Sequence, residues 1–133
     1  MIVVDTNVMV GLLVDEDVTS RASHVLAFDR EWSAPPILPI EFRNALLRYV
    51  RRGDFTPERA KAMAADAAAI LGNRIYDMPG DAVIDVALEC GLTAYDAEFV
   101  ALARAMGVTL VSMDAAILRG APDVAVPLEV FVP

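Results

Sequence analysis

The sequence predicts an α/β fold in which a central parallel β-sheet of four or five strands is flanked by α-helices. Short runs of β-branched and apolar residues alternate with longer stretches of helical periodicity, a pattern typical of parallel strands joined by helices. The chain has 133 residues, of which 56% are hydrophobic, and this is enough for one domain with its own core. We therefore expect a single domain over residues 1–133.

The amino-terminal part is predicted to contain one strand and one helix. The run Ile2–Val4 is too short and too apolar for an amphipathic helix, so we expect a buried strand that ends at Asp5. After a loop with acidic residues at 15–17, Thr19 or Ser20 is placed to cap a helix that runs to about residue 30. A short extended stretch is expected at 33–36, because the prolines there disfavour helical backbone before them.

Two helices are predicted in the middle of the chain from their ends and apolar stripes. Residues 37–52 carry apolar side chains at the i, i+4, i+7 and i+8 spacing and end before Gly53. The next helix begins at Thr56-Pro57-Glu58, which supplies a hydroxyl cap, a proline at the first helical position and an acid near the positive end of the helix dipole. Its alanine-rich sequence is expected to reach Leu71 and to stop at Gly72.

The remaining part of the chain is predicted to contain two helices and three strands. The helices are each closed by a glycine and are expected at about residues 81–89 and 94–106. The strands are short apolar runs at 74–78, 108–113 and 129–132. The second of these runs leads directly into Asp114, as the first strand of the chain leads into Asp5.

The charge and cysteine content limit the classes of function. Eleven basic against nineteen acidic residues give a net charge of −8, which argues against attraction of nucleic acid over the whole surface. The same balance permits a local cluster of carboxylates that holds a cation, or a basic partner. The single cysteine excludes a disulfide framework and a cysteine-ligated metal site, and it indicates a reducing, cytoplasmic compartment. No apolar run approaches the roughly 20 residues of a membrane-spanning helix.

Four acidic residues are candidates for a shared site. Asp5 and Asp114 each follow a predicted strand, and in an open parallel sheet ligands bind outside the carboxyl ends of the strands. Asp96 lies in the first turn of its predicted helix, and Glu41 lies early in another. Each acid also has an ordinary interpretation, as a cap or as a favourable charge near a helix amino terminus. The four become informative only if folding brings them together, and periodicity alone does not show that.

These acids lie in four short motifs, which follow one another along the chain as VDTNV (4–8), PIEFRNAL (39–46), TAYDAEFVALA (93–103) and LVSMD (110–114). Together they resemble the motifs of PIN-domain ribonucleases, particularly the VapC-type toxins of type II toxin–antitoxin (VapBC) pairs. The resemblance extends from residue 2 to about residue 118 and fits a single PIN domain.

The resemblance implies a function and a set of site residues. The function is that of a metal-dependent endoribonuclease toxin, which hydrolyses RNA phosphodiester bonds by metal-activated water and leaves 5′-phosphate and 3′-hydroxyl ends. The catalytic and metal-binding acids map onto Asp5, Glu41, Asp96 and Asp114, and the supporting residues are Thr6, Asn7 and Ser112. Serine stands at position 112 in place of the usual threonine and keeps the hydroxyl group. The implied partners are a VapB-type antitoxin that blocks the acidic crevice and a second copy of the chain in a homodimer.

A physical argument supports this assignment. Carboxylates gathered in one crevice repel one another, and some take up protons unless a cation is present. Hard divalent ions such as Mg²⁺ or Mn²⁺ prefer oxygen ligands, and Mg²⁺ keeps several waters while it takes only a few carboxylates. A bound metal lowers the pKa of a coordinated water and stabilises negative charge on a phosphoryl oxygen. Asp5 and Asp96 are the expected direct ligands.

An acidic protein needs local basic groups to hold RNA. On an ideal helix Arg48 and Arg52 lie 7 and 11 residues beyond Glu41, so the three share one side, with spacings of about 10 and 16 Å along the axis. We predict that both arginines guide RNA phosphates toward the metal. The alternative is a solvated arginine face, or salt bridges to acidic neighbours.

Two other functions are left open. A noncatalytic PIN module that serves as an interaction scaffold would share the motifs but show no stabilisation by metal. A haloacid-dehalogenase-like phosphatase is suggested by the opening Asp5-Thr-Asn-Val and by the stretch Gly80-Asp-Ala-Val-Ile-Asp85. Against the phosphatase, Asn7 stands where that class needs its second acid.

Overall fold

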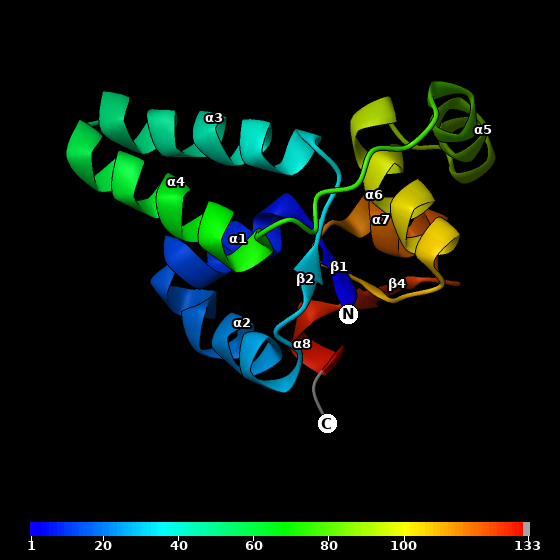
Figure 1. Cartoon of the computed structure of the whole chain (residues 1–133), viewed down its shortest axis with the longest axis horizontal. Helices are drawn as coiled ribbons and strands as arrows, with labels where there is room; N and C mark the ends of the chain where they lie inside the picture. The colour runs from blue at the N-terminus through cyan, green and yellow to red at the C-terminus, as the bar shows by residue number, and fades with distance from the viewer. Residues whose placement is uncertain (132–133) are drawn as a thin grey trace.

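The computed structural model describes residues 1–131, and the side chains of all of these except Glu16. Its centre is a four-stranded parallel sheet in the order β2-β1-β3-β4 (Figure 1). The strands are β1 (Ile2–Val4), β2 (Trp32–Ser33), β3 (Leu110–Ser112) and β4 (Ala125–Pro127). The predicted α/β class is therefore confirmed, with four strands.

The register of the sheet places the two aspartate-terminated strands side by side. Val3 pairs with Ser33 of β2 on one side and with Leu110 of β3 on the other, and Val4 pairs with Val111. All three residues of β1 and of β3 are buried, as expected for strands covered on both faces. Both strands run in the same direction, so the residues that follow them emerge at the same edge of the sheet.

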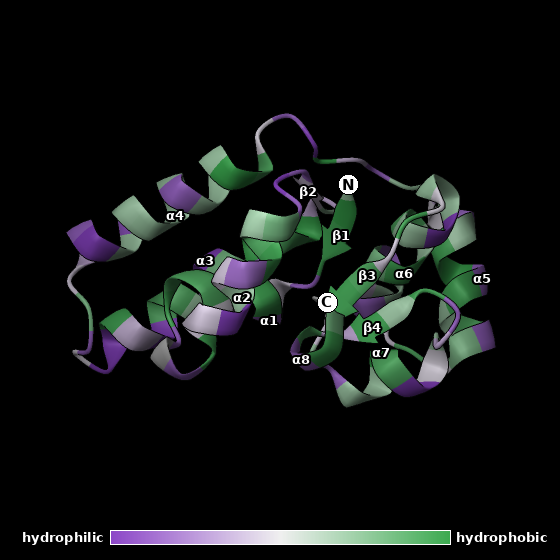
Figure 2. Cartoon of the chain, turned by 90° about the horizontal axis from the view of Figure 1, so that it is seen from below, coloured by the Kyte–Doolittle hydropathy of each residue, from purple (hydrophilic) through white to green (hydrophobic). Residues whose placement is uncertain are grey.

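Eight helices surround this sheet in the described part of the chain. Figure 1 shows α1 to α4 on one side of the sheet and α5 to α7 on the other, and Figure 2 shows hydrophobic strands at the centre of the molecule. The helices are α1 (Thr6–Leu13), α2 (Glu16–Phe28), α3 (Ile37–Arg51), α4 (Pro57–Leu71), α5 (Gly80–Cys90), α6 (Ala94–Met106), α7 (Ala115–Gly120) and α8 (Leu128–Phe131). None of them is long and apolar enough to cross a membrane.

The helices with clear sequence signals begin and end close to their predicted positions. The Thr56 hydroxyl accepts a hydrogen bond of 3.1 Å from the backbone N–H of Arg59 and so caps α4. Thr93 caps α6 in the same way, and Gly107 ends that helix with a φ of +66°. The predicted apolar stripe of α3 is buried against the core, as Phe42 and Leu46 show.

Near the amino terminus, the prediction missed one helix and displaced another. Helix α1 begins directly after β1, where the Asp5 side chain accepts a 2.7 Å hydrogen bond from the backbone N–H of Thr6. Its sequence is apolar nearly all round, so it lacks the periodicity that marks a surface helix. Helix α2 is capped by Asp15 and starts before Thr19, which instead donates its hydroxyl proton to the carbonyl oxygens of Gly11 and Asp15.

The predicted strand at 129–132 is wrong. Leu128–Phe131 is a short helix and Val132 lies outside the described residues, while the fourth strand, β4, is three residues long and precedes that helix. The predicted strand at 74–78 is also wrong, because its only ladder contact is an isolated parallel bridge between Ala34 and Ile75. Helix α7 was missed because its six residues are too few for periodicity to show.

Candidate active site

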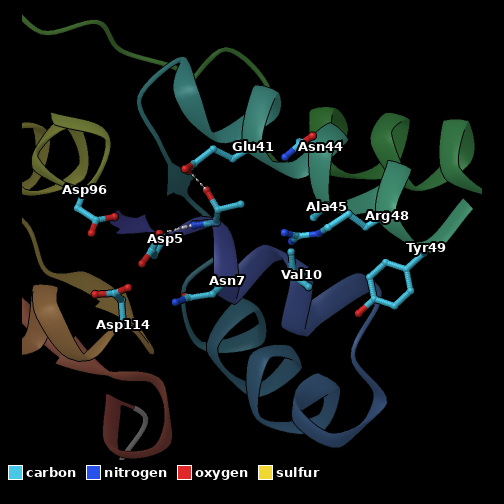
Figure 3. Close-up of a pocket in the computed structure, with 11 residues that line it drawn as sticks. Asp5, Asn7, Val10, Glu41, Asn44, Ala45, Arg48, Tyr49, Asp96 and Asp114 are labelled. Carbon is cyan, nitrogen blue, oxygen red and sulfur yellow. Dashed lines mark hydrogen bonds between the residues drawn. The ribbon is translucent and has the colours of Figure 1, made fainter. Parts of the chain in front are cut away.

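The four candidate carboxylates line one cavity of about 390 Å³ at the carboxyl edge of the sheet. Asp5 follows β1, Asp114 follows β3, Asp96 lies in the first turn of α6 and Glu41 lies in α3. Figure 3 shows their side chains directed toward a common space from these four elements. Folding therefore brings together four acids that are up to 109 positions apart in the sequence.

Asp5 is the most buried of the four acids, with 6% of its surface exposed. One carboxylate oxygen accepts the 2.7 Å bond from the Thr6 N–H that begins α1, and the other accepts a 2.6 Å bond from the Ser112 hydroxyl. The Ser112 oxygen in turn accepts a 2.9 Å bond from the backbone N–H of Asp114. Ser112 therefore links the two strand-end acids with the hydroxyl group that it shares with threonine.

Glu41 and Asn7 are tied to the same framework. The Thr6 hydroxyl donates a 2.7 Å hydrogen bond to Oε1 of Glu41 and so connects the start of α1 to α3 (Figure 3). The Asn7 side-chain oxygen accepts a bond of 3.3 Å from the backbone N–H of Met113. Three predicted supporting residues, Thr6, Asn7 and Ser112, thus hold the acids or the loop after β3 in place.

The ordinary interpretation of the strand-end acids also holds. Asp114 caps α7 by accepting a 3.0 Å hydrogen bond from the backbone N–H of Ile117, as Asp5 caps α1. Each cap uses one carboxylate oxygen, and the second oxygen of Asp114 accepts no hydrogen bond from residues 1–131 as described. Capping fixes the direction of the carboxylate, so it positions these acids and does not compete with a role in the cavity.

The electrostatics of the cavity show a shortage of positive charge. Burial raises the pKa of Asp5 to about 6, its two hydrogen bonds oppose this shift, and the charges of Asp96 and Asp114 add to it. The pKa of Asp96 is raised as well, first by burial and then by the charges of Asp114 and Glu41. A cation in the cavity would lower the pKa of both acids, whereas the neighbouring carboxylates raise it.

The donor set fits a hard divalent cation that keeps part of its water shell. Within the described residues, no group of three or more His, Cys, Asp or Glu side chains is gathered closely enough to hold a metal ion by itself. Mg²⁺ does not need such a group, because it is commonly held by one or two carboxylates with water as the remaining ligands. Asp5, with its raised pKa, and Asp96 offer oxygen ligands of this kind beside each other.

The two candidate arginines have different positions. Arg48 lines the cavity, and Figure 3 shows its guanidinium directed toward the acids. Arg52 is not among the lining residues; it lies at the end of α3 and pairs with Asp54 at 3.2 Å. Arg48 is the one basic side chain that lines the cavity within the described part of the chain, and no carboxylate there forms an ion pair with it.

The sequence interpretation did not include two polar residues that line the cavity, Asn44 and Tyr49. They lie three and eight residues after Glu41 in α3, spacings that place a helical residue near the same face. This spacing from Glu41 is the sequence signal from which both residues could have been predicted. The stretch Gly80–Asp85, which suggested a phosphatase, forms the start of α5, and Asp85 is exposed and outside the cavity lining.

Comparisons with known proteins show the family and the fold of the chain. The model of the PIN domain family matches residues 2–121. The chain is 27% identical over 130 residues to the protein named Ribonuclease VapC3 of Pyrobaculum aerophilum, a match that covers 95% of this chain and 98% of that protein. Its fold is similar to the crystal structure of PAE2754 from the same organism, with a TM-score of 0.76, 23% sequence identity, and coverage of 96% of this chain and 83% of that one.

Proposed function

Since the chain belongs to the PIN domain family, we propose that it is an endoribonuclease toxin that hydrolyses RNA phosphodiester bonds and is inhibited by an antitoxin. The observation that carries this proposal is the cavity in which Asp5, Glu41, Asp96 and Asp114 meet. The similarity to a ribonuclease of the VapC type over nearly the whole of both chains supports RNA as the substrate class.

In the proposed mechanism, Mg²⁺ or Mn²⁺ would be held by Asp5 and Asp96 directly, and by Glu41 and Asp114 through water. When bound, the ion would supply a water of lowered pKa and stabilise negative charge on a phosphoryl oxygen. The Ser112 and Thr6 hydroxyls keep Asp5 and Glu41 pointed into the cavity through their hydrogen bonds of 2.6 and 2.7 Å.

The remaining residues act on the substrate. Arg48 presents a planar set of N–H donors that matches a phosphate, and it is the cavity's own counter-charge to the RNA backbone. Water adds to the phosphorus, the bond to the 3′-oxygen breaks, and that oxygen leaves with a proton. The products are a 5′-phosphate and a 3′-hydroxyl end.

The proposal extends to regulation. A VapB-type antitoxin would block the cavity, and a basic inhibitory segment would be attracted by the four carboxylates and by a net charge of −8. We further propose that the toxin acts as a homodimer in the cytoplasm, where its RNA substrate is found.

The test compares RNA cleavage by the native protein and by Asp5→Asn, each with EDTA, Mg²⁺ or Mn²⁺. We expect cleavage by the native protein only with a metal, and loss of cleavage in the variant. The matched control is Asp85→Asn, because Asp85 is an exposed aspartate outside the cavity and belongs to the phosphatase motif. Metal-independent cleavage would contradict the metal assignment. A native protein that is neither stabilised by metal nor able to cleave RNA would indicate a noncatalytic module.

A further inference from the structure

The basic residues of this acidic protein are concentrated in one part of the fold. Residues 43–61 contain six basic and two acidic residues, whereas the rest of the chain contains five basic and seventeen acidic residues. This segment is most of the hairpin formed by α3 and α4, which Figure 1 shows extending away from the sheet. The hairpin is therefore locally positive, although the molecule as a whole repels RNA.

At the turn of this hairpin, two aromatic rings and two guanidinium groups form an arginine–aromatic stack of Tyr49, Arg52, Phe55 and Arg59. The rings of Tyr49 and Phe55 are stacked, with centroids 4.9 Å apart and planes inclined by 18°. The guanidinium carbon of Arg52 lies 4.7 Å from the Tyr49 ring centre, and that of Arg59 lies 4.4 Å from the Phe55 ring centre. Each distance is within the range of a cation–π contact.

The local backbone fixes this stack. Gly53, with a φ of +83°, reverses the chain after α3, and the Asp54 N–H donates a 2.9 Å hydrogen bond to the Tyr49 carbonyl oxygen. The turn thereby brings Phe55 back onto Tyr49. The Thr56 cap holds the backbone of Arg59 in the first turn of α4, where a cation is unfavourable next to the positive end of the helix dipole. Helix stability therefore gives no reason for an arginine at this position.

The stack continues from the cavity. Tyr49 belongs to both, since it also lines the cavity beside Arg48 (Figure 3). Along α3, Tyr49 lies about 12 Å beyond Glu41, at 1.5 Å per residue. A single RNA strand with one phosphate among the carboxylates would meet Arg48 first and then the stack.

We propose that the arginine–aromatic stack binds the backbone of single-stranded RNA beside the phosphate that is cleaved, with Arg52 and Arg59 each contacting a phosphate. This proposal rests on the proposed ribonuclease function. A ring against the face of a guanidinium leaves its in-plane N–H groups free to bind a phosphate in bidentate fashion. It also restricts a long side chain before RNA arrives, so less conformational entropy is lost on binding.

The existing contacts of the two arginines do not prevent this role. Arg59 forms no ion pair among the described residues, and Arg52 has one, to Asp54, with both partners more than half exposed. An exposed ion pair of this kind contributes little and leaves the other donors of the guanidinium free. The rings add a means of preorganisation that charge alone would not supply.

The test is the salt dependence of RNA binding, measured by fluorescence anisotropy with a labelled single-stranded oligonucleotide. All proteins carry Asp5→Asn, so that binding is measured without cleavage. We expect Arg52→Gln with Arg59→Gln to weaken binding at least tenfold at low salt. The slope of log K against log salt should fall by about 1.4, which corresponds to two lost phosphate contacts on a single strand. The matched control is Arg30→Gln with Arg119→Gln, two exposed arginines outside the hairpin, and it should change the slope less.

The rings are tested with Tyr49→Leu and Phe55→Leu. We expect these variants to weaken binding while keeping most of the salt slope, because the charges remain but are no longer preorganised. An unchanged slope in the double arginine variant would overturn the proposal. It would also be overturned if this variant lost as much affinity for polyglutamate as for RNA, because that result would indicate general anion binding. Failure of the proposed function is a separate result, since the native protein would then cleave no RNA under any metal condition.

Discussion

Replacing Asp5 with asparagine should stabilise the metal-free protein at neutral pH. The pKa of Asp5 is raised from 3.8 to about 6, so between these pH values the folded protein holds a proton that the unfolded chain releases. Its unfolding free energy therefore falls as the pH rises through this window, by about 3 kcal/mol at 1.36 kcal/mol per pKa unit. The neutral asparagine does not carry this cost.

Part of that gain is lost through the hydrogen bonds. An asparagine oxygen can still accept the Thr6 N–H bond, but its amide group cannot accept the bond that the Ser112 hydroxyl now donates to Asp5. A lost bond of this kind costs about 1 kcal/mol. The net expectation is a variant that is about 2 kcal/mol more stable than the native protein at pH 8 and no more stable at pH 3.5.

The assay is urea unfolding in EDTA at a series of pH values, with Asp85→Asn as the control for a general change in net charge. Asp85 is exposed on α5, so the control curve should stay close to that of the native protein. The difference in unfolding free energy between Asp5→Asn and the native protein should grow as the pH rises from 4 to 7. If it did not, the buried Asp5 carboxylate would not destabilise the fold in the way that its surroundings indicate.

Three further outcomes are expected. Adding Mg²⁺ should raise the melting temperature of the native protein and leave Asp5→Asn nearly unchanged, as differential scanning fluorimetry can show. Ser112→Ala should destabilise the fold by roughly 1–3 kcal/mol and raise the pKa of Asp5 further, so that cleavage begins at a higher pH; Ser112→Thr keeps the hydroxyl and serves as the control. Gly120→Ala should cost roughly 1–3 kcal/mol in urea unfolding, because its Cβ would lie 2.5 Å from the Cys90 carbonyl oxygen, whereas Gly80→Ala meets nothing within 4 Å.

The elements that could be predicted from the sequence are those with local signals at their ends. Helix α4 shows this most clearly, since Thr56 and Pro57 mark its start and Gly72 its end, and the structure places it at Pro57–Leu71. Helix α1 carries no such periodicity, because it is packed against other elements on most sides and is apolar nearly all round. The last strand was misplaced because three residues of β4 and four of α8 are both too short for a period to be read.

The sequence predicted only part of the grouping of the four acids in one cavity. Asp5 and Asp114 follow recognisable strands, so their shared edge could be expected from the rule for parallel sheets. Nothing local distinguishes Glu41 from any other acid on a helix surface; it joins the site through the Thr6 hydroxyl, 35 residues away. The stack of Tyr49 on Phe55 was not anticipated either, because it depends on the path of the turn at Gly53 and not on a helical period.

The distribution of charge shows how an acidic protein could also bind RNA, as the proposed function requires. A site that gathers a divalent cation needs uncompensated carboxylates, and any arginine placed among them would neutralise the field that attracts the ion. The basic residues lie outside that group of acids: Arg48 lines the cavity, and five of the other ten basic residues lie on the α3–α4 hairpin. Under the proposed function, RNA would be attracted at the hairpin, and the phosphate to be cleaved would lie between this positive surface and a metal-loaded cavity. Without metal, the same RNA would meet four carboxylates, so metal should strengthen RNA binding to the native protein more than to Asp5→Asn. Equal strengthening in both proteins would show that the ion acts on the RNA and not through these acids.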